Sequence, residues 1–120
     1  MARIIVVEQD QLMRALLVEW LGSGGHIVSA YSRIDLMPGD EADLLIVDVV
    51  MPRHGGCARL RALQASRPRT PLIAISAQFT AGSSGASACA LGVRRVIGKP
   101  FARERLLRVV GEVIAATPVS

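Results

Sequence analysis

Five short apolar runs, separated by longer amphipathic or polar segments, are the feature that most restricts how this sequence can fold. The runs are mostly β-branched, are bounded by polar or turn residues, and comprise Ile4–Val7, Ile27–Val28, Leu44–Val47, Leu72–Ile75 and Val96–Ile97. Short continuous apolar runs are typical of strands that are buried on both faces, as in a parallel sheet covered by helices. We therefore predict five strands.

Helical patterns lie between several of these runs. Gln11–Leu21 carries apolar residues at helical spacing, with Asp10 placed to cap its start and Gly22 placed to end it. The same period appears in Ala58–Ala65 and most clearly in Ala102–Ala116, where one apolar stripe comprises Leu106, Leu107, Val110, Val113 and Ile114. Strands that alternate with helices predict an α/β fold, a doubly wound parallel sheet with helices on both faces.

Two further segments predict only weak helices. Ser32–Ala42 contains Pro38-Gly39 within eleven residues, which leaves room for a short second helix. Ala81–Leu91 has no charged residue, few large side chains and two glycines, each of which costs about 1 kcal/mol of helix propensity relative to alanine. We expect a short second helix and a weak fourth helix, with Ala102–Ala116 as the fifth.

The length and composition predict one domain over residues 1–120, with Thr117–Ser120 as a tail. Hydrophobic residues make up 51% of the chain, which is enough for a core. No stretch holds the roughly 20 apolar residues that a membrane span requires, and the start of the sequence has no secretory signal. Cys57 and Cys89 lack partners at metal or redox spacing, so we expect a reducing, cytoplasmic location.

The charge of the chain suits an acidic partner, since the formal net charge is +4 and the isoelectric point is about 10.0. The arginines are nevertheless spread along the sequence, and no aromatic residues interleave with them. We therefore expect no direct binding to nucleic acid.

Polar side chains follow four of the predicted strands. Glu8 and Gln9 follow the first strand, Asp48 the third, Ser76 the fourth and Lys99 the fifth. Ligands of open parallel sheets bind beyond the carboxyl ends of the strands. Each residue taken singly has an ordinary structural explanation, such as a cap or a surface salt bridge. Together they supply the acids, hydroxyl and ammonium that bind a metal ion and a phosphoryl group.

At these positions the sequence resembles the receiver domains of two-component response regulators. The matching segments, in chain order, are IIVVEQD with the helix behind it, LLIVDVVMPRHGG, LIAISA and VIGKPF. Each segment alone is a weak signal, but four in this order at the ends of the expected strands are specific, and the resemblance covers essentially the whole chain. It implies a five-stranded, doubly wound, flavodoxin-like receiver fold.

The resemblance also implies a set of roles for the site residues. Asp48 would accept a phosphoryl group from a phosphohistidine of a sensor histidine kinase or phosphotransfer protein. Glu8, Asp48 and the backbone carbonyl of Val50 would hold Mg²⁺. Lys99 would contact the phosphoryl oxygens, and Ser76 would reorient towards them. Such a domain is not an enzyme in the ordinary sense, because it catalyses only its own phosphorylation and dephosphorylation.

Two positions depart from the family pattern. Gln9 stands where the family carries a second acid, ordinarily the more direct metal ligand, so it offers a carbonyl oxygen without charge and predicts weak Mg²⁺ binding. Asp10 could substitute, but its place at a helix start indicates a cap. Val96 stands where the family has an aromatic residue that changes rotamer on switching. The resemblance further implies a cis peptide bond between Lys99 and Pro100.

Three functional hypotheses follow. We favour a phosphorylatable receiver domain that signals to an unknown downstream protein through Ala81–Leu91 and the fifth helix, where Arg103, Arg105 and Arg108 suit an acidic partner. The second hypothesis is a degenerate pseudo-receiver that acts as an unphosphorylated interaction module. The third is a small flavin or nucleotide enzyme of similar topology, and it lacks a phosphate-binding glycine loop after the first strand.

Overall fold

The computed structural model describes residues 2–33, 39, 41–48, 56–76 and 93–116, with the side chains of residues 56–60 and 76 outside the description. A parallel sheet of five strands forms the centre of the fold in the order β2-β1-β3-β4-β5. The strands are β1 (Arg3–Val7), β2 (Ile27–Tyr31), β3 (Leu44–Asp48), β4 (Leu72–Ser76) and β5 (Arg95–Gly98). All five predicted strands are confirmed, and strand order reverses between β1 and β3, as in a doubly wound sheet.

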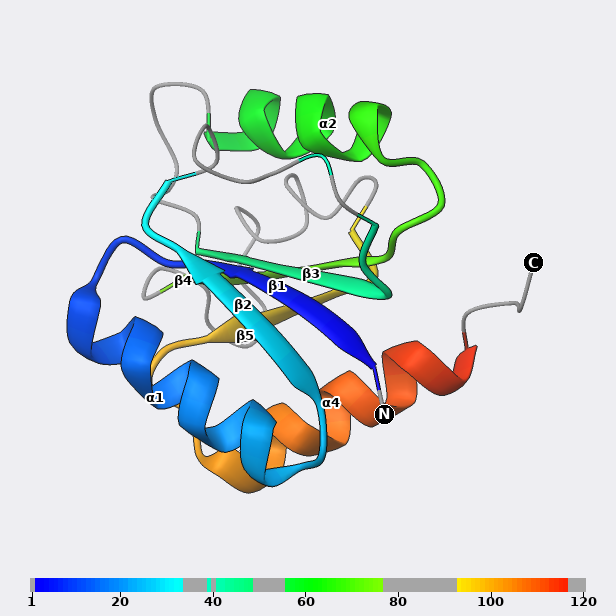
Figure 1. The fold of residues 1–120 in the computed structure, drawn as a ribbon. Helices are drawn as coiled ribbons and strands as arrows, with labels where there is room; N and C mark the ends of the chain where they lie inside the picture. Colours follow the sequence, from blue (N-terminus) through cyan, green and yellow to red (C-terminus); the bar gives the residue numbers. More distant parts are fainter. Residues whose placement is uncertain (1, 34–38, 40, 49–55, 77–92, 117–120) are drawn as a thin grey trace.

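Helices cover both faces of this sheet. Within the described residues they are α1 (Gln11–Ser23), α2 (Gly56–Ser66) and α4 (Arg103–Ala116). Figure 1 shows α1 and α4 on one face of the sheet and α2 on the other. The predicted doubly wound α/β architecture is therefore confirmed. None of these helices is both long and apolar enough to cross a membrane.

The start of α1 follows the sequence prediction, whereas its end does not. The Asp10 carboxylate accepts a hydrogen bond from the backbone N–H of Met13 at 3.1 Å, which confirms the predicted cap. The helix continues past Gly22 to Ser23 and is capped by Gly24. A local motif explains the difference: Gly25 has a positive φ of 89°, and the backbone N–H groups of Gly25 and His26 donate to the carbonyls of Gly22 and Leu21 at 3.0 and 3.2 Å.

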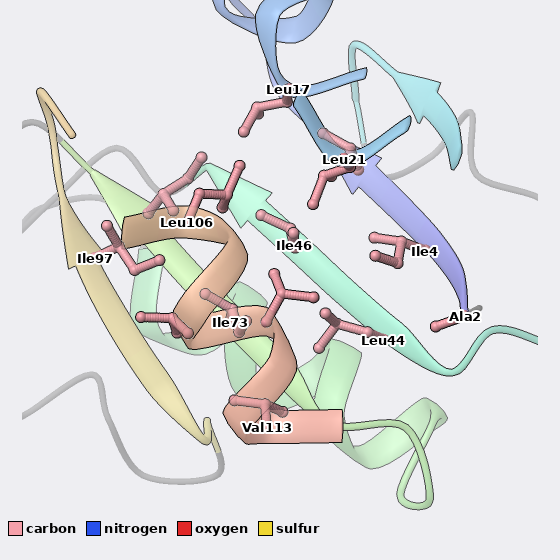
Figure 2. Close-up of a cluster of buried hydrophobic side chains, with 14 residues drawn as sticks. Ala2, Ile4, Leu17, Leu21, Leu44, Ile46, Ile73, Ile97, Leu106 and Val113 are labelled. Atoms are coloured by element: carbon pink, nitrogen blue, oxygen red, sulfur yellow. The ribbon is translucent and has the colours of Figure 1, made fainter. Parts of the chain in front are cut away.

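The larger core lies between the sheet and the helices α1 and α4 (Figure 2). Its fully buried members include Ile4, Leu17, Leu21, Leu44, Ile46, Ile73, Ile97 and Leu106. Alternate strand residues, such as Ile5 and Leu45, enter a second cluster with Leu63 of α2. This alternation is what strands buried on both faces require.

The apolar stripe of α4 is wider than predicted. Leu106, Val110 and Val113 are buried as expected, and Val109, which the predicted stripe omitted, is buried as well. A helix lying along a sheet contacts it over a broad strip, so residues beside the central stripe also lose their exposure.

Several predictions lie outside the described residues. The weak fourth helix expected over Ala81–Leu91 falls entirely outside them, as does the tail Thr117–Ser120. Most of Ser32–Ala42, where a short second helix was expected, also lies outside them.

Candidate functional site

Parallel strands bring the predicted site residues to one edge of the sheet. Asp48 and Ser76 are the last residues of β3 and β4, and Glu8 and Lys99 directly follow β1 and β5. Asp48 pairs in register with Ile75, one residue before the end of β4, so these strand ends lie level with one another. The site therefore forms at the carboxyl edge, where the sequence predicted it.

Lys99 joins the two acids of this edge. Its ammonium lies 2.7 Å from Glu8 Oε1 and 3.1 Å from Asp48 Oδ1. To make these contacts from β5, the Lys99 side chain crosses the end of β4 and reaches the ends of β3 and β1. The peptide bond between Lys99 and Pro100 is cis, as predicted. Three of the predicted site residues thus form one charged cluster.

Glu8 is the buried member of the cluster. Its side chain has 0% exposed surface, whereas those of Asp48 and Lys99 are 13% and 20% exposed. Its second oxygen, Oε2, accepts a hydrogen bond from the backbone N–H of Asp10 at 3.1 Å. Burial raises the pKa of Glu8 above its ordinary value, and the neighbouring Asp48 carboxylate adds to this rise against the opposing effect of the Lys99 hydrogen bond.

The Lys99 ammonium is stabilised in its charged form. Burial by itself lowers the pKa of Lys99, but hydrogen bonds to Glu8 and Asp48 and their negative charges outweigh this effect, so the pKa is raised above its ordinary value. Lys99 therefore provides a fixed positive charge beside Asp48. Such a point charge is suited to binding phosphoryl oxygens.

The segment after β1 holds one contact that sequence reasoning missed. Gln9 is exposed, and Asp10 serves as the cap of α1. Arg14 of α1 donates from Nη1 to the backbone carbonyl of Glu8 at 2.8 Å and to that of Gln9 at 3.5 Å. Nothing in the sequence distinguishes Arg14 from the other arginines, because the contact depends on where the first turns of α1 place its guanidinium.

The donor atoms at this edge suit a hard cation. Two carboxylates, those of Glu8 and Asp48, meet there, and Mg²⁺ prefers oxygen ligands and needs only one or two carboxylates in addition to water. Both oxygens of Glu8 already accept hydrogen bonds, so a cation would compete with Lys99 for these acids. The roles predicted for the Val50 carbonyl and the Ser76 hydroxyl concern atoms outside the description and remain predictions.

Val96, at the position where the resemblance implies an aromatic residue, is half-buried in β5 against the α2 side of the core. The aromatic pair of Trp20 and Phe101 lies on the opposite face, with ring centroids 6.2 Å apart at an interplanar angle of 70°. Phe101 is only two residues after Lys99. The ring contact with Phe101 therefore links Trp20 to the segment that carries Lys99.

Comparison with known sequences gives a match over most of the chain. Residues 4–111 match the sequence model of a family described as response regulator receiver domain. Regulator of RpoS from Escherichia coli strain K12 is 36% identical over 102 residues, which is 82% of this chain and 30% of that protein. Response regulator MprA from Mycobacterium avium is 31% identical over 109 residues, which is 88% of this chain and 47% of that protein. The chain thus spans less than half the length of these curated relatives.

Solved structures share the fold. The response regulator protein TrrA from Thermotoga maritima, crystallised in complex with Mg²⁺ and a beryllium fluoride, superposes with a TM-score of 0.77 at 22% identity. The match covers 94% of this chain and 99% of that one. At this identity the likeness concerns the fold alone.

Proposed function

This chain belongs to the response regulator receiver domain family, and from that premise we propose that Asp48 accepts a phosphoryl group from a phosphohistidine of a sensor histidine kinase or phosphotransfer protein. The observation that carries the proposal is the position of Asp48, a partly exposed carboxylate 3.1 Å from the Lys99 ammonium. A residue with only a packing role, or a simple surface ion pair, would not need a carboxylate and an ammonium to meet at the carboxyl edge of a parallel sheet, where ligands bind. The family assignment speaks against the hypothesis of a flavin or nucleotide enzyme.

Phosphoryl transfer requires positioning and charge stabilisation, with little covalent chemistry by the protein. A carboxylate oxygen of Asp48 attacks the phosphorus, the new O–P bond forms, and the N–P bond to the donor histidine breaks. The electron pair of that bond stays on the histidine nitrogen, and Asp48 carries an acyl phosphate. Lys99 is already beside the attacking carboxylate, so its charge can stabilise the transferred oxygens without rearrangement.

We propose Mg²⁺ as a weakly bound cofactor, held by Asp48, Glu8 and the Val50 carbonyl, with Gln9 as a neutral neighbour. When bound, the ion supplies further stabilisation of the negative charge on the phosphoryl oxygens. The convergence of two carboxylates supports this assignment, as does the Mg²⁺ complex of the structurally similar TrrA. The missing carboxylate at Gln9 and the occupied oxygens of Glu8 favour low affinity.

We propose that phosphorylation alters the loops that follow the strands, with Ser76 turning towards the new phosphoryl group, and that a downstream protein reads the change at Ala81–Leu91 and α4. Arg103, Arg105 and Arg108 of α4 are exposed, which supports a partner with an acidic rim.

We further propose that residues 1–120 form one receiver domain, and that this domain catalyses only its own phosphorylation and dephosphorylation. We also propose that it acts in the cytoplasm, because its cysteine usage suits a reducing compartment.

The test is uptake of a phosphoryl analogue. Beryllofluoride added with Mg²⁺ should give a bound fluorine signal in ¹⁹F NMR of the wild-type protein, and acetyl phosphate should add one phosphoryl group by intact mass. A protein that takes up neither, and gains no phosphoryl group from any phosphohistidine donor, would be the unphosphorylated pseudo-receiver instead. Gln9 is exposed and carries no charge, where the family pattern has a second acid. This observation supports the pseudo-receiver as the second candidate function.

A further inference from the structure

Arg14 reaches the candidate site from the first turns of α1. Its guanidinium donates to the backbone carbonyls of two consecutive residues, at 2.8 Å for Glu8 and 3.5 Å for Gln9. The side chain of Arg14 is half-buried. Both bonds come from the same nitrogen, Nη1, and the bond to the Glu8 carbonyl is the shorter one.

The same residue, Glu8, is held at both ends. Its carbonyl accepts from Arg14, and its buried carboxylate accepts from Lys99 at 2.7 Å and from the backbone N–H of Asp10 at 3.1 Å. The Asp10 carboxylate in turn caps α1 through Met13. These bonds tie the segment between β1 and α1 to the first turns of the helix that carries Arg14.

We propose that Arg14 is a positioning residue of the phosphoacceptor site. By binding the Glu8 and Gln9 carbonyls, it fixes the position of the Glu8 carboxylate. That carboxylate in turn fixes the position of the Lys99 ammonium beside Asp48. The effect on phosphorylation rests on the proposed function, whereas the effect on Lys99 does not. Displacements of about 1 Å at a reacting centre can reduce rates roughly a hundredfold, so a residue remote from the chemistry can control it.

A purely electrostatic role for Arg14 makes a different prediction. Removing a positive charge near the site would strengthen the hold of the two carboxylates on Lys99 and would favour Mg²⁺ binding. Loss of positioning instead loosens the contact between Glu8 and Lys99. The two roles therefore differ in the direction of the effect on Lys99.

Lys99 can be observed alone, because it is the only lysine in the sequence. In protein labelled with ¹⁵N-lysine, a buried and hydrogen-bonded ammonium should exchange its protons slowly enough to give a resolved NMR signal. The wild type and the control Arg61→Gln, at an exposed position of α2, should show this signal. Arg14→Gln should broaden or lose it. Absence of the signal from the wild type, or its persistence in Arg14→Gln, would overturn the proposal.

A second measurement compares rates of phosphorylation by acetyl phosphate at saturating Mg²⁺. We expect Arg14→Gln to be about tenfold slower or more. Arg14→Lys keeps the charge on a side chain one atom shorter, so it should remain slow. Full rescue by Arg14→Lys would reject positioning in favour of charge. If Arg14→Gln does not fold, Arg14→Met, which also removes the charge and the donor and adds no second lysine, carries both measurements. The wild type and Arg61→Gln could fail to take up phosphoryl groups while the Lys99 signal still differs between the wild type and Arg14→Gln. That result would reject the proposed function but not the positioning role of Arg14.

Discussion

The ammonium of Lys99 lies 2.7 Å from Oε1 of Glu8, a carboxylate with no exposed side-chain surface. The pair joins residues that are 91 positions apart in the sequence and connects the end of β5 to the end of β1. A buried charge is tolerated only when it is paired and hydrogen-bonded, and both oxygens of Glu8 meet this condition. The pair therefore offsets part of the cost of burying Glu8 and places a cation beside Asp48.

Removing Lys99 should expose the dependence of Glu8 on its partner. We expect Lys99→Met to lower the free energy of unfolding by about 3 kcal/mol at neutral pH, because it leaves a buried carboxylate without its counter-charge. The double variant Lys99→Met, Glu8→Gln should recover most of this loss, since the amide carries no charge. Urea unfolding of the wild type, Lys99→Met, Glu8→Gln and the double variant compares their free energies of unfolding. Equal losses in the single and double variants would contradict a coupled pair.

The raised pKa of Glu8 predicts a pH dependence of stability. The folded protein holds the Glu8 proton more tightly than the unfolded chain, whose carboxyl has the ordinary value of 4.5. The stability contributed by this group therefore falls as pH rises from 4.5 through the folded pKa, by about 1.4 kcal/mol for each unit of difference. Unfolding free energies of the wild type should decline relative to those of Glu8→Gln over this window. Parallel curves would show that Glu8 titrates as it does when unfolded.

Lys99 predicts a separate effect at alkaline pH. Its pKa is raised from the ordinary 10.5, so its stabilising contribution is complete below 10.5 and is lost as pH rises through the folded value. The wild type should therefore lose stability above pH 10.5 by an amount that Lys99→Met does not show. Thermal unfolding of both proteins between neutral and strongly alkaline pH measures this difference. A loss of equal size in Lys99→Met would assign the alkaline effect to other groups.

Asp48 is the residue on which the proposed chemistry depends. Asp48→Asn and Asp48→Ala should remain folded, with stability within about 1 kcal/mol of the wild type, because the carboxylate is partly exposed and adds little packing. Both should lose phosphoryl uptake entirely. Asp43→Asn, at an exposed aspartate that accepts a hydrogen bond from the backbone N–H of Arg3, is the matched control and should retain uptake. Full uptake by Asp48→Asn would place the phosphoacceptor elsewhere.

Gln9→Asp should strengthen Mg²⁺ binding. A unit charge about 4 Å away is worth roughly 4 kcal/mol per unit of ion charge at an effective dielectric of 20, and solvation should reduce this to about a tenfold gain in affinity. Calorimetry measures the gain, with Trp20 fluorescence as a second signal through its contact with Phe101. Gln11→Asp, an exposed position in the first turn of α1, should have less effect. Equal affinities for Gln9→Asp and the wild type would mean that residue 9 does not face the ion.

Two glycines at the end of α1 should respond oppositely to alanine. Gly22 lies within the helix with nothing within 4 Å of an added Cβ, so Gly22→Ala should stabilise the protein by about 0.5–1 kcal/mol. Gly24→Ala would bring a Cβ 2.8 Å from Leu107 Cδ2 and should cost about 1–2 kcal/mol, because the leucine must move within a packed contact. Thermal unfolding separates the two. An unchanged stability of Gly24→Ala would show that the Leu107 side chain of α4 can move aside at no cost.

The sequence alone was sufficient to predict the sheet, because each strand carries its own local signal. Runs such as Leu44–Val47 are apolar on both faces, and Asp10 marks the start of α1 by a bond within one turn. The end of α1 is also marked locally, although the prediction assigned it to the wrong glycine, Gly22. Gly25, three residues later, adopts the positive φ that ends the helix, and only the close approach of Leu107 to Gly24 depends on residues far apart in the chain.

The sequence also identified the residues at the strand ends, since the carboxyl edge of a parallel sheet follows from strand direction. It did not determine how deep each residue lies. The complete burial of Glu8 and the reach of Lys99 across β4 arise only when strands from distant parts of the chain lie side by side. Burial and charge pairing are sums over groups from distant parts of the chain, so tertiary structure alone could decide them.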